Sequence, residues 1–68
     1  MQPIRSRALS DVGYDRTTRT LRVRFHHGGL YDYLDVPEHV YEALRRSQHP
    51  WTDWGRHIKD SYECVSLE

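Results

Sequence analysis

The sequence predicts an α+β fold, in which a three-stranded antiparallel β-meander is followed by two short helices packed on one face. Three observations predict it. Apolar and aromatic side chains recur at strand period in three short runs, Val12–Asp15, Leu21–Phe25 and Gly28–Tyr33. Polar and glycine-containing segments separate these runs, as in hairpins. The apolar residues then recur at helical spacing, first behind Pro37 and again behind Pro50.

The first hairpin has a register that its own side chains select. We expect Tyr14 opposite Leu21 and Val12 opposite Val23, because this pairing gathers the apolar side chains on one face. Leu9 is out of phase with Val12, which indicates a bulge or bend before the strand.

The second hairpin is closed by a three-residue loop, His26–Gly28, with its glycine in the left-handed bulge position. This loop length sets Val23 opposite Tyr31 and Leu21 opposite Tyr33. A two-glycine turn would instead set a phenylalanine against an aspartate, so we reject it. Both tyrosines therefore point toward the core.

The first helix follows the third strand directly. Pro37 suits the first helical position, and Glu38 lies in the first turn, where the helix dipole favours an anion. Glu42 can reach Arg46 at i+4, so part of the charge is a local ion pair. The helix packs by an apolar stripe at helical spacing: Val40, Tyr41 and Leu44.

The second helix is expected over Trp51–Asp60, with its apolar side chains on one side. Trp54 and Ile58 belong to the core. Trp51 lies beside Pro50 in a turn and is the ring that we expect to be exposed.

The two ends of the chain receive different expectations. Met1–Ser6 is expected to be a loose end, whereas Tyr62 and Val65 finish the domain as an extended segment against the core. A single domain is expected over residues 1–66. Leu67 and Glu68 are typical of a cloning scar before an affinity tag, and we assign them no function.

Length and composition restrict the class of protein. A domain of 68 residues has a small core, worth roughly 3–5 kcal/mol in total. Cys64 is the only cysteine, so no disulfide is available, which suits a reducing cytoplasm. The sequence has no signal peptide and no run of about 20 apolar residues. We therefore expect a cytoplasmic protein without a membrane partner.

The charge is zero overall but uneven along the chain. Residues 1–24 hold six arginines and two aspartates, and residues 25–44 hold four acidic side chains and no lysine or arginine. Such segments fit a phosphate-facing surface, but they also fit complementary contacts with a protein partner or a second copy.

Three arginines, Arg19, Arg22 and Arg24, form a candidate nucleic-acid-binding stripe, with Arg5 and Arg7 beside them. Each phosphate that such a stripe neutralises adds a salt-dependent increment to the affinity for RNA or DNA. The strand register also sets Arg22 opposite Asp32 and Arg24 opposite Asp11. These pairs would contribute about 0.2–1 kcal/mol each and neutralise the stripe. Both interpretations remain open.

A second candidate group mixes aromatic and basic side chains, as single-strand binders do when bases stack on rings. It consists of Trp51, Arg56 and Lys59, with Trp54 and His57 beside them. The alternative is that the indoles complete the core.

The histidines and the cysteine favour neither a metal site nor catalysis. Five histidines and Cys64 are scattered without paired CxxC or HxxxH spacing. Cys64 lies near a terminus without an activating helix start. We expect no metal, no cofactor and no enzymatic activity.

In their order along the chain, these residues resemble the KTSC domain family, a small domain found at the C-terminus of some lysyl-tRNA synthetases and as a single-domain protein. The matching positions are Val12-Gly13-Tyr14-Asp15, Leu21, Val23, Phe25, Gly28 or Gly29, Tyr31, Tyr33, Val36-Pro37, Val40-Tyr41, Trp54, Ile58 and Tyr62. The resemblance implies a three-stranded antiparallel sheet packed with helices. Its occurrence in the same chain as a lysyl-tRNA synthetase implies a link to translation or nucleic-acid metabolism.

Pro50-Trp51 and Gly55 depart from the family pattern around the second helix. The expected function is a small non-enzymatic module associated with RNA, tRNA or DNA, and the alternative is a module for protein interaction or self-association.

Overall fold

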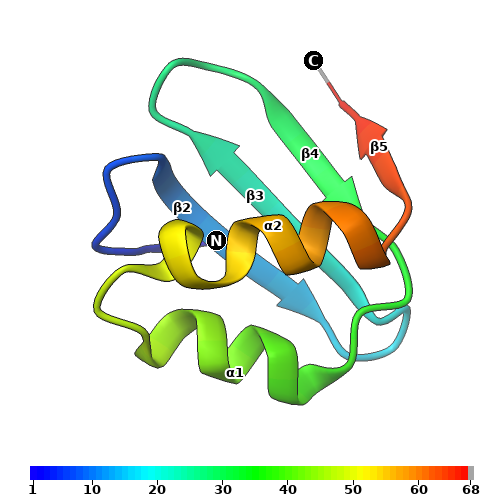
Figure 1. Cartoon of the computed structure of the whole chain (residues 1–68). Coiled ribbons are helices and arrows are strands. Elements are labelled where there is room, and N and C mark those ends of the chain that lie inside the picture. The colour runs from blue at the N-terminus through cyan, green and yellow to red at the C-terminus, as the bar shows by residue number, and fades with distance from the viewer. Residues whose placement is uncertain (68) are drawn as a thin grey trace.

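A computed structural model describes residues 1–67 of the chain. Glu68, which we expected to come from a cloning scar, lies outside the described residues. The fold is α+β, as predicted (Figure 1). The five strands, in their order across one antiparallel sheet, are β1 (Gln2–Pro3), β2 (Leu9–Asp15), β3 (Thr20–Phe25), β4 (Leu30–Tyr33) and β5 (Cys64–Ser66). The helices are α1 (Glu38–Arg46) and α2 (Pro50–Ser61).

The central meander of β2, β3 and β4 has the predicted register throughout. Val23 pairs with Val12 on one side and with Tyr31 on the other. The three-residue loop is confirmed, because the Phe25 N–H donates to the Gly29 carbonyl at 3.1 Å. Gly28 has a φ of 98°, in the left-handed region that favours glycine. The periodicity of the side chains therefore predicted both hairpins correctly.

The N-terminal segment corrects one prediction. Met1–Ser6 is not a loose end, because Gln2 pairs with Val12 and Pro3 with Asp11 to form β1. The register slips between Leu9 and Asp11, which confirms the bulge, and β2 begins at Leu9 rather than at Val12. A strand of two residues is too short to leave a periodic signal in the sequence.

The C-terminal segment adds the other edge of the sheet. The expected extended segment is β5, in which Val65 pairs with Asp32 and Cys64 with Tyr33. The sheet therefore has five strands where the sequence predicted three. Both additions are short edge strands, so the predicted meander remains the centre of the sheet.

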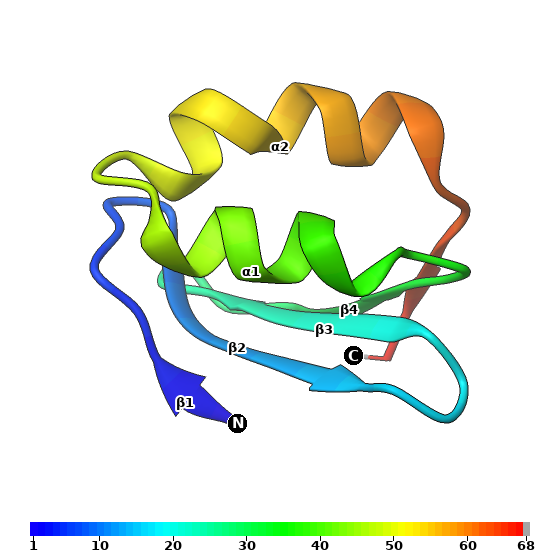
Figure 2. The same cartoon turned by 90° about the horizontal axis from the view of Figure 1, so that it is seen from below.

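Both helices pack on the same face of the sheet (Figure 2). Tyr41 of α1 stacks on Tyr14 of β2 with ring centroids 5.1 Å apart. The core that these layers enclose consists of ten buried apolar side chains: Leu9, Val12, Leu21, Val23, Tyr33, Val36, Val40, Tyr41, Leu44 and Ile58. The opposite face of the sheet carries no helix.

Trp51 corrects a second prediction. It lies in the first turn of α2, which begins at Pro50. Its ring packs edge-on against Phe25, with ring centroids 5.4 Å apart, and at a tilt of 51° against Tyr33, with ring centroids 6.2 Å apart. A β-carbon on Gly55 would lie 2.8 Å from two atoms of this indole. Glycine therefore lets the Trp51 ring lie flat against the helix, and the ring is half-buried rather than exposed.

Of the other two core predictions for α2, Ile58 is fully buried, whereas Trp54 is half-buried against the core. Within residues 1–67, neither helix has the length and apolar character needed to cross a membrane.

Candidate nucleic-acid interface

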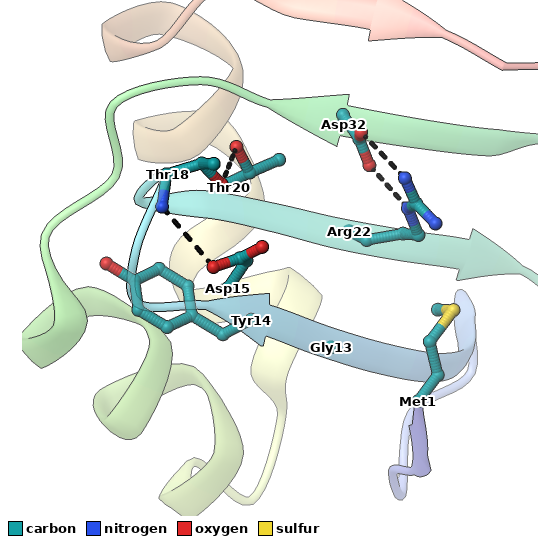
Figure 3. Close-up of a pocket in the computed structure, with 8 residues that line it drawn as sticks. All are labelled: Met1, Gly13, Tyr14, Asp15, Thr18, Thr20, Arg22 and Asp32. Carbon is teal, nitrogen blue, oxygen red and sulfur yellow. Dashed lines mark hydrogen bonds and ion pairs between the residues drawn. The ribbon is translucent and has the colours of Figure 1, made fainter.

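The first predicted group, Arg19, Arg22 and Arg24, is largely neutralised by neighbouring carboxylates. Arg22 donates two hydrogen bonds to Asp32, from Nε to Oδ1 at 2.7 Å and from Nη2 to Oδ2 at 3.1 Å (Figure 3). These bonds and the carboxylate charge raise the pKa of Arg22 above its ordinary value. The Nε of Arg19 lies 3.9 Å from Asp35.

Arg24 differs from its two neighbours. Asp11 lies opposite it in the sheet, as predicted, but its carboxylate accepts a hydrogen bond from the Ser10 hydroxyl at 3.0 Å. Among residues 1–67, no ion pair involves Arg24. The predicted stripe therefore has one available arginine rather than three.

The second predicted group lies on the helical side of the molecule. The Lys59 ammonium lies 5.8 Å from the centre of the Trp51 ring, and Arg56 lies 3.8 Å from Asp60. Arg22 and Arg24 point away from the helices, on the opposite side of the sheet. The fold therefore does not bring the two predicted groups onto one surface.

A different set of arginines is left without ion pairs in the described part of the chain. Glu42 contacts Arg45 at 3.6 Å, rather than Arg46 as the helical spacing predicted. All members of the set lie where β2 begins and where β3 and α1 end. We call this region the basic end, and its residues are Arg5, Arg7, Arg24 and Arg46.

Part of the basic end borders a hollow of about 340 Å³. The hollow lies between the loop of residues 4–8 and the first turn of α2, and it is lined by Arg5, Arg7, His49 and Trp51, among others. Two cations, an imidazole and an aromatic surface thus border a single concave site. Such a combination can contact phosphates and a nucleobase together.

The loop that carries Arg5 and Arg7 is held by hydrogen bonds. The Ser6 hydroxyl accepts from the backbone N–H groups of Ala8 and Leu9, both at 3.1 Å. The His26 N–H donates to the Ala8 carbonyl at 2.9 Å. The arginines therefore extend from an ordered loop, which lowers the entropic cost of binding a ligand.

The opposite end of the molecule contains arginines of a different kind. Arg16 donates to Glu38 at 2.9 Å, and Arg19 lies near Asp35. We call this region the paired end, and its residues are Arg16, Arg19, Asp35 and Glu38. Its charges cancel locally, so it offers phosphates little net attraction.

Sequence reasoning treated Arg5 and Arg7 only as neighbours of the stripe and assigned Arg46 to a helical ion pair. One signal was available for the first two, because the nearest acidic residue along the chain is Asp11. No comparable signal identifies Arg46, since Glu42 can reach either of two adjacent arginines.

The other polar groups do not form a second site. Cys64 is an exposed free thiol. Burial, with the adjacent Cys64 as a second cause, raises the pKa of Tyr33 to about 12. Within residues 1–67, no three His, Cys, Asp or Glu side chains are grouped in a way that would hold a metal ion.

Comparison with known proteins places this arrangement in a family. The sequence profile of the KTSC domain matches residues 5–62. A protein of Tsukamurella paurometabola is 31% identical over 67 residues, which span 98% of this chain and 100% of that protein. An uncharacterised protein of Stutzerimonas stutzeri is 33% identical over 60 residues, covering 88% of this chain and 79% of its own length.

A solved structure agrees with the fold. The crystal structure of a KTSC domain protein from Yersinia pestis superimposes with a TM-score of 0.91 at 28% sequence identity, and the match covers 98% of this chain and 94% of that one. The names of these relatives state no activity.

Proposed function

The chain belongs to the KTSC domain family, and from that premise we propose that it is a non-enzymatic module whose basic end binds RNA. The observation that carries the proposal is the hollow beside the first turn of α2. Arg5 and Arg7 border it, and neither has an ion-pair partner among residues 1–67. Unpaired arginines are available to phosphates without first breaking an internal ion pair.

Two complementary interactions support binding of a nucleic acid at this hollow. The guanidinium groups of Arg5 and Arg7 match phosphate oxygens, and the indole of Trp51 in the lining can contact one base. RNA is also the ligand that the family's occurrence in some lysyl-tRNA synthetases favours. The free thiol of Cys64 suits the reducing cytoplasm in which we expect the protein to act.

Fluorescence anisotropy with a short labelled single-stranded RNA tests the proposal. We expect salt-dependent binding, and we expect Arg5→Ala with Arg7→Ala to weaken it. If both arginines neutralise phosphates, the slope of log K against log salt decreases in magnitude by roughly 1.4 in this variant, because each phosphate on a single strand accounts for about 0.7 of the slope.

The matched control replaces two arginines at the paired end, Arg16→Ala with Arg19→Ala. Both double variants remove the same formal charge, so non-specific attraction decreases equally in the two proteins. An equal decrease in affinity in both variants contradicts a site at the basic end. Absence of binding by the unmodified protein at low salt contradicts the proposed function itself.

DNA of the same sequence is a useful second ligand. The proposed interactions are with phosphates and with the face of a base, which RNA and DNA share. A similar affinity for both means that the basic end does not read the 2′-hydroxyl. A tighter RNA complex means that the hollow binds this hydroxyl.

A further inference from the structure

The face of the sheet that carries no helix, which we call the open face, gathers the exposed apolar side chains. The large hydrophobic residues exposed in the described chain are Met1, Val65 and Leu67, with exposed fractions of 53%, 41% and 40%. Val65 pairs with the outward-facing Asp32, and the side chain of Met1 lies over Gly13. Leu67 continues β5, since its N–H donates to the Leu30 carbonyl at 2.8 Å.

One row of residues across the open face is self-complementary. Consecutive register pairs place Gly13, Arg22, Asp32 and Val65 side by side on β2, β3, β4 and β5. The glycine at one end forms part of a hollow of about 330 Å³, which Arg22 and Asp32 also line (Figure 3). The valine at the other end is an exposed apolar side chain. The order along the row is therefore a hollow, a positive charge, a negative charge and a protrusion.

We propose that the open face binds a second copy of this chain, related by a two-fold axis that runs along the strands between β3 and β4. Such an axis exchanges β3 with β4 and β2 with β5. It sets Arg22 of each copy against Asp32 of the other, and it sets Val65 of each copy over the hollow at Gly13 of the other. Like charges do not face each other in this row, and the apolar side chain of Val65 meets the apolar side chain of Met1, which lies over Gly13 and borders the hollow.

The dimensions of the molecule restrict the strength of this dimer. The Cα atoms extend 26 × 26 × 22 Å. A standard interface takes roughly 800 Å² from each partner, so nearly the whole open face has to be buried. We therefore expect a reversible dimer with a dissociation constant on the order of micromolar or weaker.

The dimer also determines where the two proposed RNA sites lie relative to each other, and this consequence rests on the proposed function. An axis parallel to the strands does not exchange their two ends. The basic ends of both copies would therefore lie at the same end of the dimer. A single strand of RNA can then bind two sets of arginines, which raises the affinity through effective concentration.

Sedimentation velocity across a concentration series, without nucleic acid, tests the dimer alone. We expect the sedimentation coefficient to increase with concentration. Val65→Lys should raise the dissociation constant roughly tenfold or more, because it places a hydrated ammonium over the hollow. The matched control is Thr52→Lys, which adds the same charge on the helical side and should leave dimerisation unchanged.

A charge swap tests the orientation. Arg22→Asp alone places aspartates against each other and should weaken the dimer, whereas Arg22→Asp with Asp32→Arg restores opposite charges and should recover it. Circular dichroism establishes that each variant is folded. A protein that stays monomeric at millimolar concentration overturns the proposal and leaves the open face to a different partner. Dimerisation and RNA binding are tested independently. If the Arg5 and Arg7 variant loses RNA binding but sediments as the unmodified protein does, the dimer does not depend on the proposed RNA site.

Discussion

The two faces of the sheet are built from alternate residues of the same strands, yet they differ in nearly every chemical property. On β3, Leu21 and Val23 are fully buried beneath the helices, whereas Arg22 and Arg24 are exposed on the open face. The residues by which the chain resembles its family lie mostly on the covered face. The family pattern therefore describes a shared core, and the activity has to be sought on the open face and at the basic end.

The largest test of this difference removes a side chain from the covered face. Leu21→Ala should lower the free energy of unfolding by about 2–5 kcal/mol, since Leu21 is fully buried and leaves a cavity. A domain of this size has roughly that much stability in total. We expect the variant to be substantially unfolded at 37 °C by circular dichroism. A cooperative transition close to that of the unmodified protein would show that the core collapses around the cavity.

The second test uses pH to probe the hydroxyl of Tyr33 on the covered face. Burial raises its pKa to about 12, so the folded state holds the phenolic proton more tightly than the unfolded chain does. The stability from this group is therefore complete below pH 10 and is lost as pH rises from about 10 through 12. Urea unfolding at pH 8, 10 and 11 measures the loss.

Tyr33→Phe is the matched variant for that experiment. It should unfold with a weaker dependence on pH above 10, because it removes the buried phenol whose pKa is raised. Cys64→Ser measures the smaller contribution of the adjacent thiol to the raised pKa of Tyr33. The same alkaline loss in the Tyr33 variant and in the unmodified protein would assign the dependence to another group.

A third test concerns the packing of α2 on the covered face. Gly55→Ala adds helix propensity, but its β-carbon would lie 2.8 Å from the Trp51 indole, which is held against Phe25 and Tyr33. We expect the steric conflict to exceed the gain and to destabilise the protein by about 1–2 kcal/mol. Thermal unfolding measures the change, and Trp51→Phe with Gly55→Ala should recover part of it.

The smallest effect on stability should come from the open face. Arg22→Ala removes a two-bond ion pair from a side chain that is 47% exposed and screened by solvent, so we expect a much smaller loss of stability than for Leu21→Ala. Urea unfolding of Arg22→Ala and Leu21→Ala compares the loss in free energy of unfolding for two adjacent residues on opposite faces of the sheet. A loss as large as that of Leu21→Ala would mean that the open face stabilises the monomer as strongly as the core does.

The sequence predicted more of the fold than of the site. Alternation in Leu21, Val23 and Phe25 was sufficient for both hairpin registers, because a shift by one residue moves every apolar side chain to the wrong face. The arginines carry no such constraint. Arg22 and Arg24 look equivalent along β3, but of the two only Arg22 has a carboxylate within ion-pair distance in the described part of the chain.

By itself, the sequence determined the central meander, the two helices and the covered face, since strand and helix periods are local properties of the chain. Only the tertiary structure decided the N-terminal edge strand β1, the packing of Trp51 against Phe25, and which arginines remain without ion pairs. These features depend on which distant segments meet. A two-residue strand forms only where β2 presents an edge, and an arginine is neutralised only where folding brings an available carboxylate within a few ångströms of it.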